Sequence, residues 1–226
     1  MKKTLIAATL MMCAGSAFAD STAVLQVNGK LTNAACTPEL SNGGVVDYGY
    51  VRLGTLSATA INPLDEKSIE LTINCTAPTK VSWYTQDDRA DSVPSSILKV
   101  KNASGSLVSL PKYLVFGLGQ TKDGVNIGNY ALLIAPNPTV DGKAGTLIYR
   151  NNDWGASKAW DDQVNTQRSD HFEQLTVAST GTVDPLAFTT ATFTLKPHPT
   201  IQDTTTLAIT DDTPIDGQVT ISLNYL

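Results

Sequence analysis

Three adjacent residues, Ser169, Asp170 and His171, carry the side-chain types of a hydrolase triad. Such a triad is assembled by the fold, which brings its members from separate segments into hydrogen-bonding reach. Neighbours in one polar stretch do not give that geometry, so we predict no catalytic site here. The other histidine, His198, lies between two prolines in "KPHP", which is typical of an extended surface turn rather than of a ligand.

Two further patterns have the residue types of a binding site but lack its spacing. In "DDTPIDG", Asp211, Asp212 and Asp216 offer oxygen ligands for calcium, but the spacing of a calcium loop is missing. The stretch "GLGQTKDG" at 117–124 is rich in glycine, but no helix follows to offer its N-terminus to a phosphate. We therefore predict that the chain is not an enzyme and that it holds no metal and no cofactor.

Two tryptophans stand in the least patterned part of the chain, residues 150–171, which we expect to be a long loop or an insertion. Trp154 and Trp160 are surrounded by Asn and Asp side chains in "NNDWGASKAWDDQ". Aromatic rings beside polar groups can hold a sugar or a peptide through stacking and hydrogen bonds. They can equally pack on the body of the protein and fix the loop, and the sequence leaves both roles open.

The first nineteen residues have the pattern of a secretory signal peptide. Lys2 and Lys3 precede an apolar run over 5–12, and the small-residue pattern "AFA" follows at 17–19. The run is too short to span a bilayer, so we expect export with cleavage after Ala19. A lipoprotein signal cut before Cys13 is the alternative, although Met12 stands where a small residue is wanted.

Loss of the signal leaves 207 residues with an acidic balance and two cysteines. Fourteen Lys and Arg then face 21 Asp and Glu, a net charge of −7, which argues against nucleic acid and anionic membranes as partners. Cys36 and Cys75 remain, and in an exported chain a disulfide is the default for such a pair. A metal site is the alternative, but neither histidine lies at ligand spacing from a cysteine.

The chain reads as one all-β domain, because helical periodicity is almost absent and short alternating segments recur between turn sequences. No linker divides it and no internal repeat is evident. Such punctuation is typical of a sandwich or barrel. The predicted strands cover residues 23–31, 45–53, 68–75, 80–85, 96–102, 112–119, 129–135, 145–150, 173–179, 191–197 and 217–226.

The last of these strands has the cleanest alternation and runs to within one residue of the C-terminus. Val219, Ile221, Leu223 and Tyr225 are apolar or aromatic, with polar residues between them. Exposed edge strands tend to pair with other chains, and proteins usually blunt them with charge, proline or a bulge. This strand has none of these after Gly217. It either lies inside a sheet or pairs with another molecule.

Three motifs in the correct order resemble subunits of chaperone–usher fimbriae. "VNGKLTNAACTPEL" at 27–40 is similar to the start of such subunits, and "SIELTINC" to the strand that carries the second cysteine. The ending, with Tyr225 as the penultimate residue, is also similar. The chain is longer than a major fimbrial subunit and shorter than a two-domain tip adhesin, which favours a minor or fimbrial-like branch.

The resemblance implies an immunoglobulin-like sandwich that lacks its last strand, over residues 29–226, and a groove beside the C-terminal strand. A periplasmic chaperone, and later the N-terminal extension of the next subunit, would insert a strand there. One set of residues is implied for the groove and another for the donated segment 20–28. The groove residues are Val219, Ile221, Leu223, Tyr225 and Leu226, and the donor residues are Ala23, Leu25, Val27 and Gly29.

The expected function is therefore that of a structural or adhesive fimbrial-like subunit. Its partners would be a periplasmic chaperone, an outer-membrane usher and other subunits. It would pass through the periplasm to a fimbrium or stay there. The alternative is a self-complete, secreted β-sandwich that recognises a host glycan or protein through the loop with Trp154 and Trp160.

Overall fold

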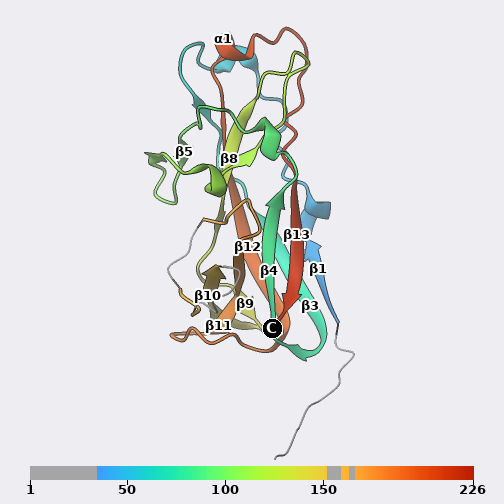
Figure 1. Ribbon diagram of the computed structural model, residues 1–226. Coiled ribbons are helices and arrows are strands. Elements are labelled where there is room, and N and C mark those ends of the chain that lie inside the picture. Colours follow the sequence, from blue (N-terminus) through green and yellow to red (C-terminus); the bar gives the residue numbers. More distant parts are fainter. Residues whose placement is uncertain (1–34, 152–158, 163–165) are drawn as a thin grey trace, which may run out of the picture. The chain divides into compact units, whose positions relative to one another are not determined.

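The computed structural model describes residues 35–151, 159–162 and 166–226, which belong to one compact unit, Ala34–Leu226. The elements in these ranges are almost all strands, so the predicted all-β class is confirmed (Figure 1). The longer strands are β1 (Cys36–Leu40), β3 (Ile69–Thr79), β4 (Val81–Asp87), β8 (Gly128–Ile134), β10 (Lys143–Asn151), β11 (Glu173–Ser179), β12 (Phe188–Ile201) and β13 (Val219–Tyr225).

Short elements complete the description. The two-residue strands are β2 (Asn62–Pro63), β5 (Val100–Lys101), β6 (Leu107–Val108), β7 (Phe116–Gly117) and β9 (Thr139–Val140). The helical elements are α1 (Thr204–Leu207) and the 3-10 turns η1 (Ser41–Gly44), η2 (Leu53–Thr55), η3 (Ala90–Ser92) and η4 (Lys112–Leu114). Within the described ranges, no helix is both long and apolar enough to cross a membrane.

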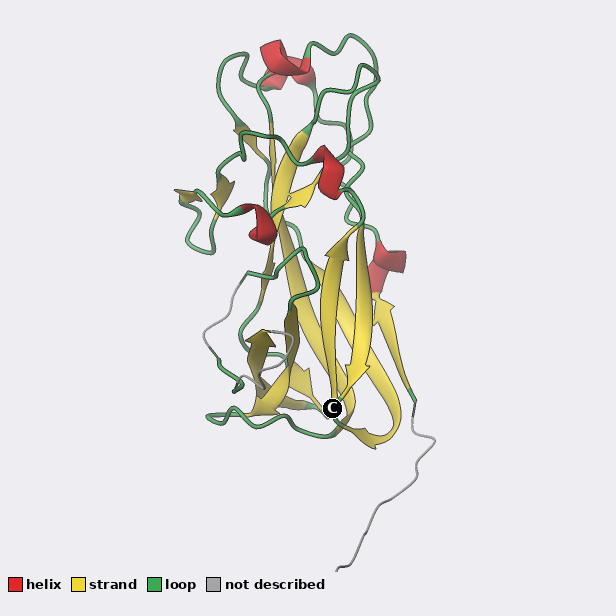
Figure 2. Cartoon of the chain, in the orientation of Figure 1, coloured by secondary structure: helices red, strands yellow, loops and turns green. Residues whose placement is uncertain are grey.

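Antiparallel pairing runs without interruption from β1 to β13, in the order β1-β3-β12-β9-β10-β11-β4-β13. Strand β10 pairs with β9 at its start and with β11 along the rest of its length, so the sheet turns there into a second layer. Strand β12 also pairs with β8, which carries β7. Figure 2 shows the long strands gathered toward the C-terminus and a group of loops and short helical turns beyond their other ends. The two strands that end the order, β1 and β13, become the open edges of the sandwich.

The core lies between the two layers and is built by the alternating residues of the long strands. Trp83 on β4 is fully buried and meets Phe193 on β12 edge-to-face, with ring centroids 5.4 Å apart. Leu71 and Ile73 on β3 are also fully buried. Edge-to-face packing adds about 0.5–1.5 kcal/mol to the burial of such rings. In the strand predicted at 68–75, the apolar residues that alternate along the sequence are thus the ones that enter the core.

The predicted disulfide is confirmed. Cys36 and Cys75 are bonded, with their Cα atoms 4.0 Å apart at opposed positions of β1 and β3. The bond fastens the first strand of the sandwich to its neighbour and closes a long loop of chain.

Of the strands predicted at 112–119 and 129–135, the first is shortened to β7 and forms a hairpin with β8 around "KDG". Phe116 and Gly117 of β7 pair with β8, and Gly124 adopts a positive φ of 79° in the turn that joins the two strands. A left-handed conformation of this kind is easily adopted by glycine alone.

The strand predicted at 45–53 is wrong. Val45 and Arg52 have extended backbone angles, but Gly49 between them adopts a positive φ of 63°, and the segment pairs with no strand in the described part of the chain. Alternation reports that one side of an extended segment is apolar, and it does not supply a neighbouring strand. This unpaired segment, residues 45–52, borders the site described below.

The surface turn predicted at "KPHP" is also wrong, because residues 196–199 lie inside β12 and His198 is only 5% exposed. The prolines are tolerated because their ring nitrogens face away from β8. On the side of β8, the carbonyl of Thr194 accepts a hydrogen bond from the N–H of Ala135. On the other side, the carbonyl of Pro199 accepts one from the N–H of Leu64. Proline is confined to such unpaired positions of a sheet.

A buried carboxylic acid on β11 makes the stability of the fold depend on pH. Glu173 is 5% exposed, and burial raises its pKa from 4.5 to about 7, against the opposing bond and charge of Arg168. The folded chain therefore keeps a proton between these pH values that the unfolded chain has released. Its free energy of unfolding falls as pH rises through this range, by up to about 3 kcal/mol for this group.

We expect Glu173→Gln to remove this dependence. At pH 8 the variant should be more stable than the native chain by about 2 kcal/mol, and at pH 4.5 the two should nearly coincide. Urea unfolding of the disulfide-bonded chain, residues 20–226, refolded at low concentration, measures both values. An equal difference at the two pH values would contradict the assignment, because a pH-independent effect cannot come from titration of Glu173.

Candidate functional site: an open groove between the first and last strands

Strand β13 offers an unpaired backbone edge. Among the described strands it pairs only with β4. Two hydrogen bonds show which residues of the segment direct their backbone groups toward β4: Asp88 N–H donates to the carbonyl of Gln218, and Leu226 N–H donates to that of Lys80. In an antiparallel pair the residues of intermediate position direct their N–H and C=O groups away from the partner. These residues are Val219, Ile221, Leu223 and Tyr225, and their backbone groups have no hydrogen-bond partner in the described part of the chain.

The side chains of this edge face the core. Val219, Ile221 and Leu223 are half-buried and pack against the core cluster, whereas Tyr225 is 53% exposed. Four of the five predicted groove residues therefore lie on one face of β13, whereas Leu226 follows the strand and donates its N–H to Lys80. Of the five, Val219 and Ile221 line the cavity described below, and Leu223, Tyr225 and Leu226 do not.

Strand β1 provides the opposite edge. Thr76 N–H donates to the carbonyl of Ala35, so Cys36, Pro38 and Leu40 direct their backbone groups away from β3. Pro38 has no N–H to offer, which blunts the edge at its centre. The N–H of Cys36 donates to the hydroxyl oxygen of Tyr225 over 2.9 Å. The two ends of the strand order, β1 and β13, thus lie beside each other (Figure 1).

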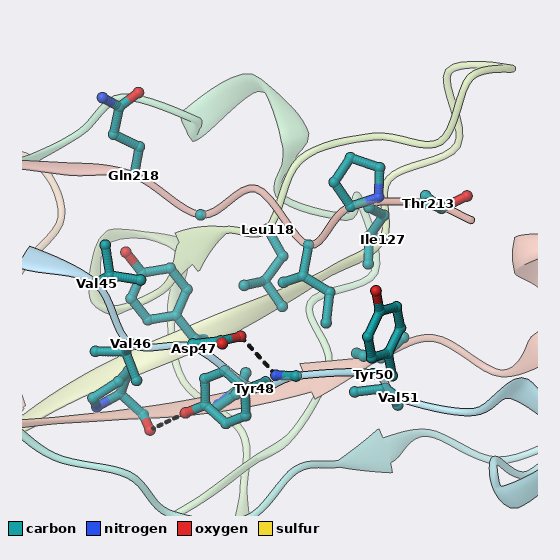
Figure 3. Close-up of a pocket in the computed structure, with 18 of the residues that line it drawn as sticks. Val45, Val46, Asp47, Tyr48, Tyr50, Val51, Leu118, Ile127, Thr213 and Gln218 are labelled. Atoms are coloured by element: carbon teal, nitrogen blue, oxygen red, sulfur yellow. Dashed lines mark hydrogen bonds between the residues drawn. The ribbon is translucent and has the colours of Figure 1, made fainter.

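A cavity of about 1120 Å³ opens between these edges and continues beyond them. Leu40 and Ile69 border it on the side of β1 and β3, and Val219 and Ile221 on the side of β13. Its floor is aliphatic, with the side chains of Leu118 and Ile127 pointing into it (Figure 3). Further floor residues are Leu132, Leu195, Ile201 and Leu207.

The segment 45–52 forms a wall that sequence reasoning did not assign to the site. Val46 and Tyr48 line the cavity (Figure 3), and the Tyr48 hydroxyl donates to the Pro197 carbonyl over 3.2 Å. Burial, with the nearby charge of Glu66, raises the pKa of Tyr48 to about 12. Tyr50 is 95% exposed at the rim. The alternating apolar residues of this segment were visible in the sequence, but they predicted a paired strand and not the side of a groove.

The backbone of this wall is only partly bonded: Asn42 bonds both backbone groups of Val45, and Lys67 donates to the carbonyl of Asp47. Gly49 N–H is bonded to the side chain of Asp47, and the N–H groups of Val46, Tyr48 and Tyr50 have no partner among the described residues. Residues 209–218 continue the line of β13 on the opposite side and border the same cavity. Both sides of the groove therefore carry some backbone groups without a partner among the described residues, beside others that are bonded.

Several contacts hold the β13 side of the groove in place. Arg89 pairs with Asp216 at 2.9 Å, and Asp216 N–H donates to the carbonyl of Leu118. The hydroxyl of Thr220 donates to Asp88 at 2.9 Å. The ion pair is partly exposed and contributes modestly, so the backbone bond is the firmer of these restraints. The edge is kept in an extended conformation without any second strand beside it.

The other residues singled out from sequence lie elsewhere. Asp170 is bonded to Arg168, and Nδ1 of His171 lies 2.9 Å from Oε1 of Gln86, so neither is directed to Ser169 by these contacts. Asp211 and Asp212 border the cavity. No group of three metal-ligating side chains occurs within the described ranges.

Trp160 is fixed to the body of the sandwich. The guanidinium of Arg150 lies 4.7 Å from the centre of its ring, and the backbone of Asp161 pairs with Tyr149 of β10. Trp154 and the donor residues Ala23, Leu25, Val27 and Gly29 lie outside the described residues. The part of the loop that is described is therefore anchored through its backbone and one stacked tryptophan.

The fold and the groove define a class: an all-β sandwich whose first and last strands leave an apolar channel between two unpaired edges. Comparison with known proteins then gives the family. The chain is 31% identical to protein GltF of Escherichia coli K12 over 98% of its own length and 96% of that protein, and it belongs to the family of GltF. It is 29% identical to the uncharacterized protein YhcF of the same organism, over 99% and 98% of the two chains. A family model described as a protein of unknown function, DUF1120, matches residues 25–131.

Proposed function

We propose that this chain is an exported, fimbrial-like subunit whose groove receives a β-strand from a partner protein. One observation carries the proposal: an apolar cavity lies beside the edge of β13, whose outward backbone groups have no partner among the described residues, and beside the edge of β1, where Cys36 alone of the outward N–H groups is bonded in the described part of the chain. Strand addition satisfies both needs at once, because the added backbone completes the ladder and alternate side chains fill the cavity.

The energetics favour an occupant that arrives early. A cavity with this much exposed aliphatic lining is an aggregation hazard in a free subunit. Unpaired strand edges increase the hazard, since they template pairing with other chains. A dedicated chaperone that inserts a strand during folding would remove both features from solvent.

The partners follow from the resemblance of the sequence to chaperone–usher subunits. A periplasmic chaperone would fill the groove first. An outer-membrane usher would then exchange the chaperone for segment 20–28 of another subunit, with Ala23, Leu25 and Val27 as its inward side chains. The protein would act in the periplasm and on the cell surface.

Periplasmic expression of the chain with and without a chaperone of this class tests the proposal. With the chaperone we expect a one-to-one complex that accumulates in soluble form. Without it we expect low yield, proteolysis and aggregation, because the groove stays exposed. A chain that reaches the same periplasmic yield without the chaperone, monomeric and resistant to proteolysis in the cell, would overturn the proposal and favour a self-complete sandwich that binds a ligand elsewhere.

A further inference from the structure

Tyr225 closes the groove at one end. Its hydroxyl accepts the N–H of Cys36 at 2.9 Å, so the phenol side chain bridges the edge of β13 and the edge of β1. The ring itself is 53% exposed, which leaves this hydrogen bond as its visible attachment. The cavity is bordered by Ile221 and Leu40, whereas Leu223, Tyr225 and Cys36 are not part of its lining. The open part of the groove therefore ends before the position of Tyr225.

The spacing of the two edges agrees with this closure. Neighbouring strands lie about 4.8 Å apart, so two edges must be about 10 Å apart to admit a third strand between them. Residues of β1 and β13 approach to within 8 Å, Cα to Cα, at their closest. Where they approach this closely the edges leave no room for a strand between them, and the lining of the cavity lies toward residues 45–52 and 209–218 rather than toward Tyr225.

We infer that Tyr225 is the stop that sets how far an added strand extends along β13, and hence its register. The inference rests on the proposed function, because it concerns the same groove. A partner strand pairs with the unpaired groups of Val219 and Ile221 and with the segment beyond them. It cannot extend past Leu223 while Tyr225 is bonded to Cys36. Because side chains alternate along a strand, a stop that fixes the last paired residue also fixes which side chains enter the cavity.

The asymmetry of the two edges strengthens this role. Pro38 offers no N–H, and the N–H of Cys36 is already bonded to Tyr225, so the lower part of β1 donates little to an added strand. The register must then be set from the β13 side. Tyr225 is the residue of β13 that contacts the opposite edge through a hydrogen bond, and it acts as a positioning residue rather than as part of the apolar lining.

The first test measures the closure without any partner. Tyr225→Phe keeps the ring and removes the oxygen that accepts from Cys36. In the disulfide-bonded chain 20–226, refolded at low concentration, we expect the Cys36 amide hydrogen to exchange about fivefold faster in this variant. Tyr48→Phe is the matched control, because the Tyr48 hydroxyl donates to Pro197 and does not touch either edge at Cys36. Unchanged exchange at Cys36 in Tyr225→Phe would overturn the inference.

The second test measures register with synthetic peptides. The probes are a peptide of residues 20–29 of this chain and two versions extended by Thr-Val at one end or the other. In the native chain, the peptide whose added Thr-Val lies toward Tyr225 should bind no more tightly than the peptide of residues 20–29. In Tyr225→Phe the same extension should raise the affinity about tenfold, because two more residues of the peptide can pair with β13.

The outcomes separate the two proposals. An equal gain in both proteins would overturn the stop, even where Cys36 exchange is faster. If no peptide binds either protein, the proposed capture of segment 20–28 fails and the register role fails with it. Faster exchange at Cys36 in Tyr225→Phe would then still establish the closure itself.

Discussion

Replacement of both cysteines, Cys36→Ser with Cys75→Ser, should lower the free energy of unfolding by about 4 kcal/mol. The bond closes a loop with a sequence separation of 39 residues, and loops of this length give stabilisation of that order in the chain-entropy model. Urea unfolding of the refolded native chain, residues 20–226, and of the double variant measures this difference. A loss of this size is a large part of the stability of a typical domain.

The site of the bond makes a second effect visible in the same variant. Cys36 is also the residue whose N–H holds the Tyr225 hydroxyl. Without the bond, β1 depends on its five paired residues and on contacts at the edge of the core. We expect amide exchange to increase across β1 more than in β12, which is paired on both sides. A loss below about 1 kcal/mol, with β1 still protected, would show that the ladder alone holds this strand.

The sequence predicted the interior strands well, for a physical reason. In β3, β4, β11 and β12 the apolar residues that alternate along the chain are those that meet in the core, as with Leu71, Trp83 and Phe193. Burial on one face of a strand imposes a period of two, and that period can be read without any knowledge of the neighbours. The cysteine pair was predicted because export and an even count restrict the choices to few.

Only one side of the groove could be predicted from the sequence. Residues 219–225 carry alternation that is visible in the sequence, but the opposite wall, 45–52, resembles a paired strand in sequence and is unpaired in the structure. The extension at 209–218 resembles a solvated turn in sequence, yet it borders an apolar cavity. Whether an extended segment has a partner is decided by contacts between distant parts of the chain, which local patterns do not contain. The buried position of His198 was missed for the same reason, since its burial depends on elements remote in sequence.

Introduction of a charge at the centre of the receiving edge should abolish strand capture. Ile221 borders the cavity, its side chain packs on the core, and its backbone groups face the gap. In Ile221→Asp an added strand would bury a carboxylate among the aliphatic side chains of the cavity, which costs several kcal/mol unless the group takes up a proton. We therefore expect the affinity for the peptide of residues 20–29 to fall about a hundredfold or more, measured by calorimetry on the refolded chain.

The adjacent residue supplies the matched control. Ser222 pairs with Tyr84 and directs its side chain to the opposite face from Ile221, so Ser222→Asp adds the same charge on the same strand outside the groove. It should change peptide affinity by less than about threefold, because no buried charge is created.

Stability must be separated from binding in this comparison, since Ile221 is half-buried in the free chain. Loss of its apolar contacts should lower the free energy of unfolding by about 2 kcal/mol in Ile221→Asp. Ile221→Thr keeps the β-branched shape and avoids the charge, so it should fold nearly as well as the native chain and weaken peptide binding by about tenfold. Equal affinities for Ile221→Asp and Ser222→Asp, with both chains folded, would mean that the added strand does not run along β13. The order expected for a strand seated on this edge is native, then Ser222→Asp, then Ile221→Thr, then Ile221→Asp, because affinity then depends on which face of β13 carries the change and on its polarity.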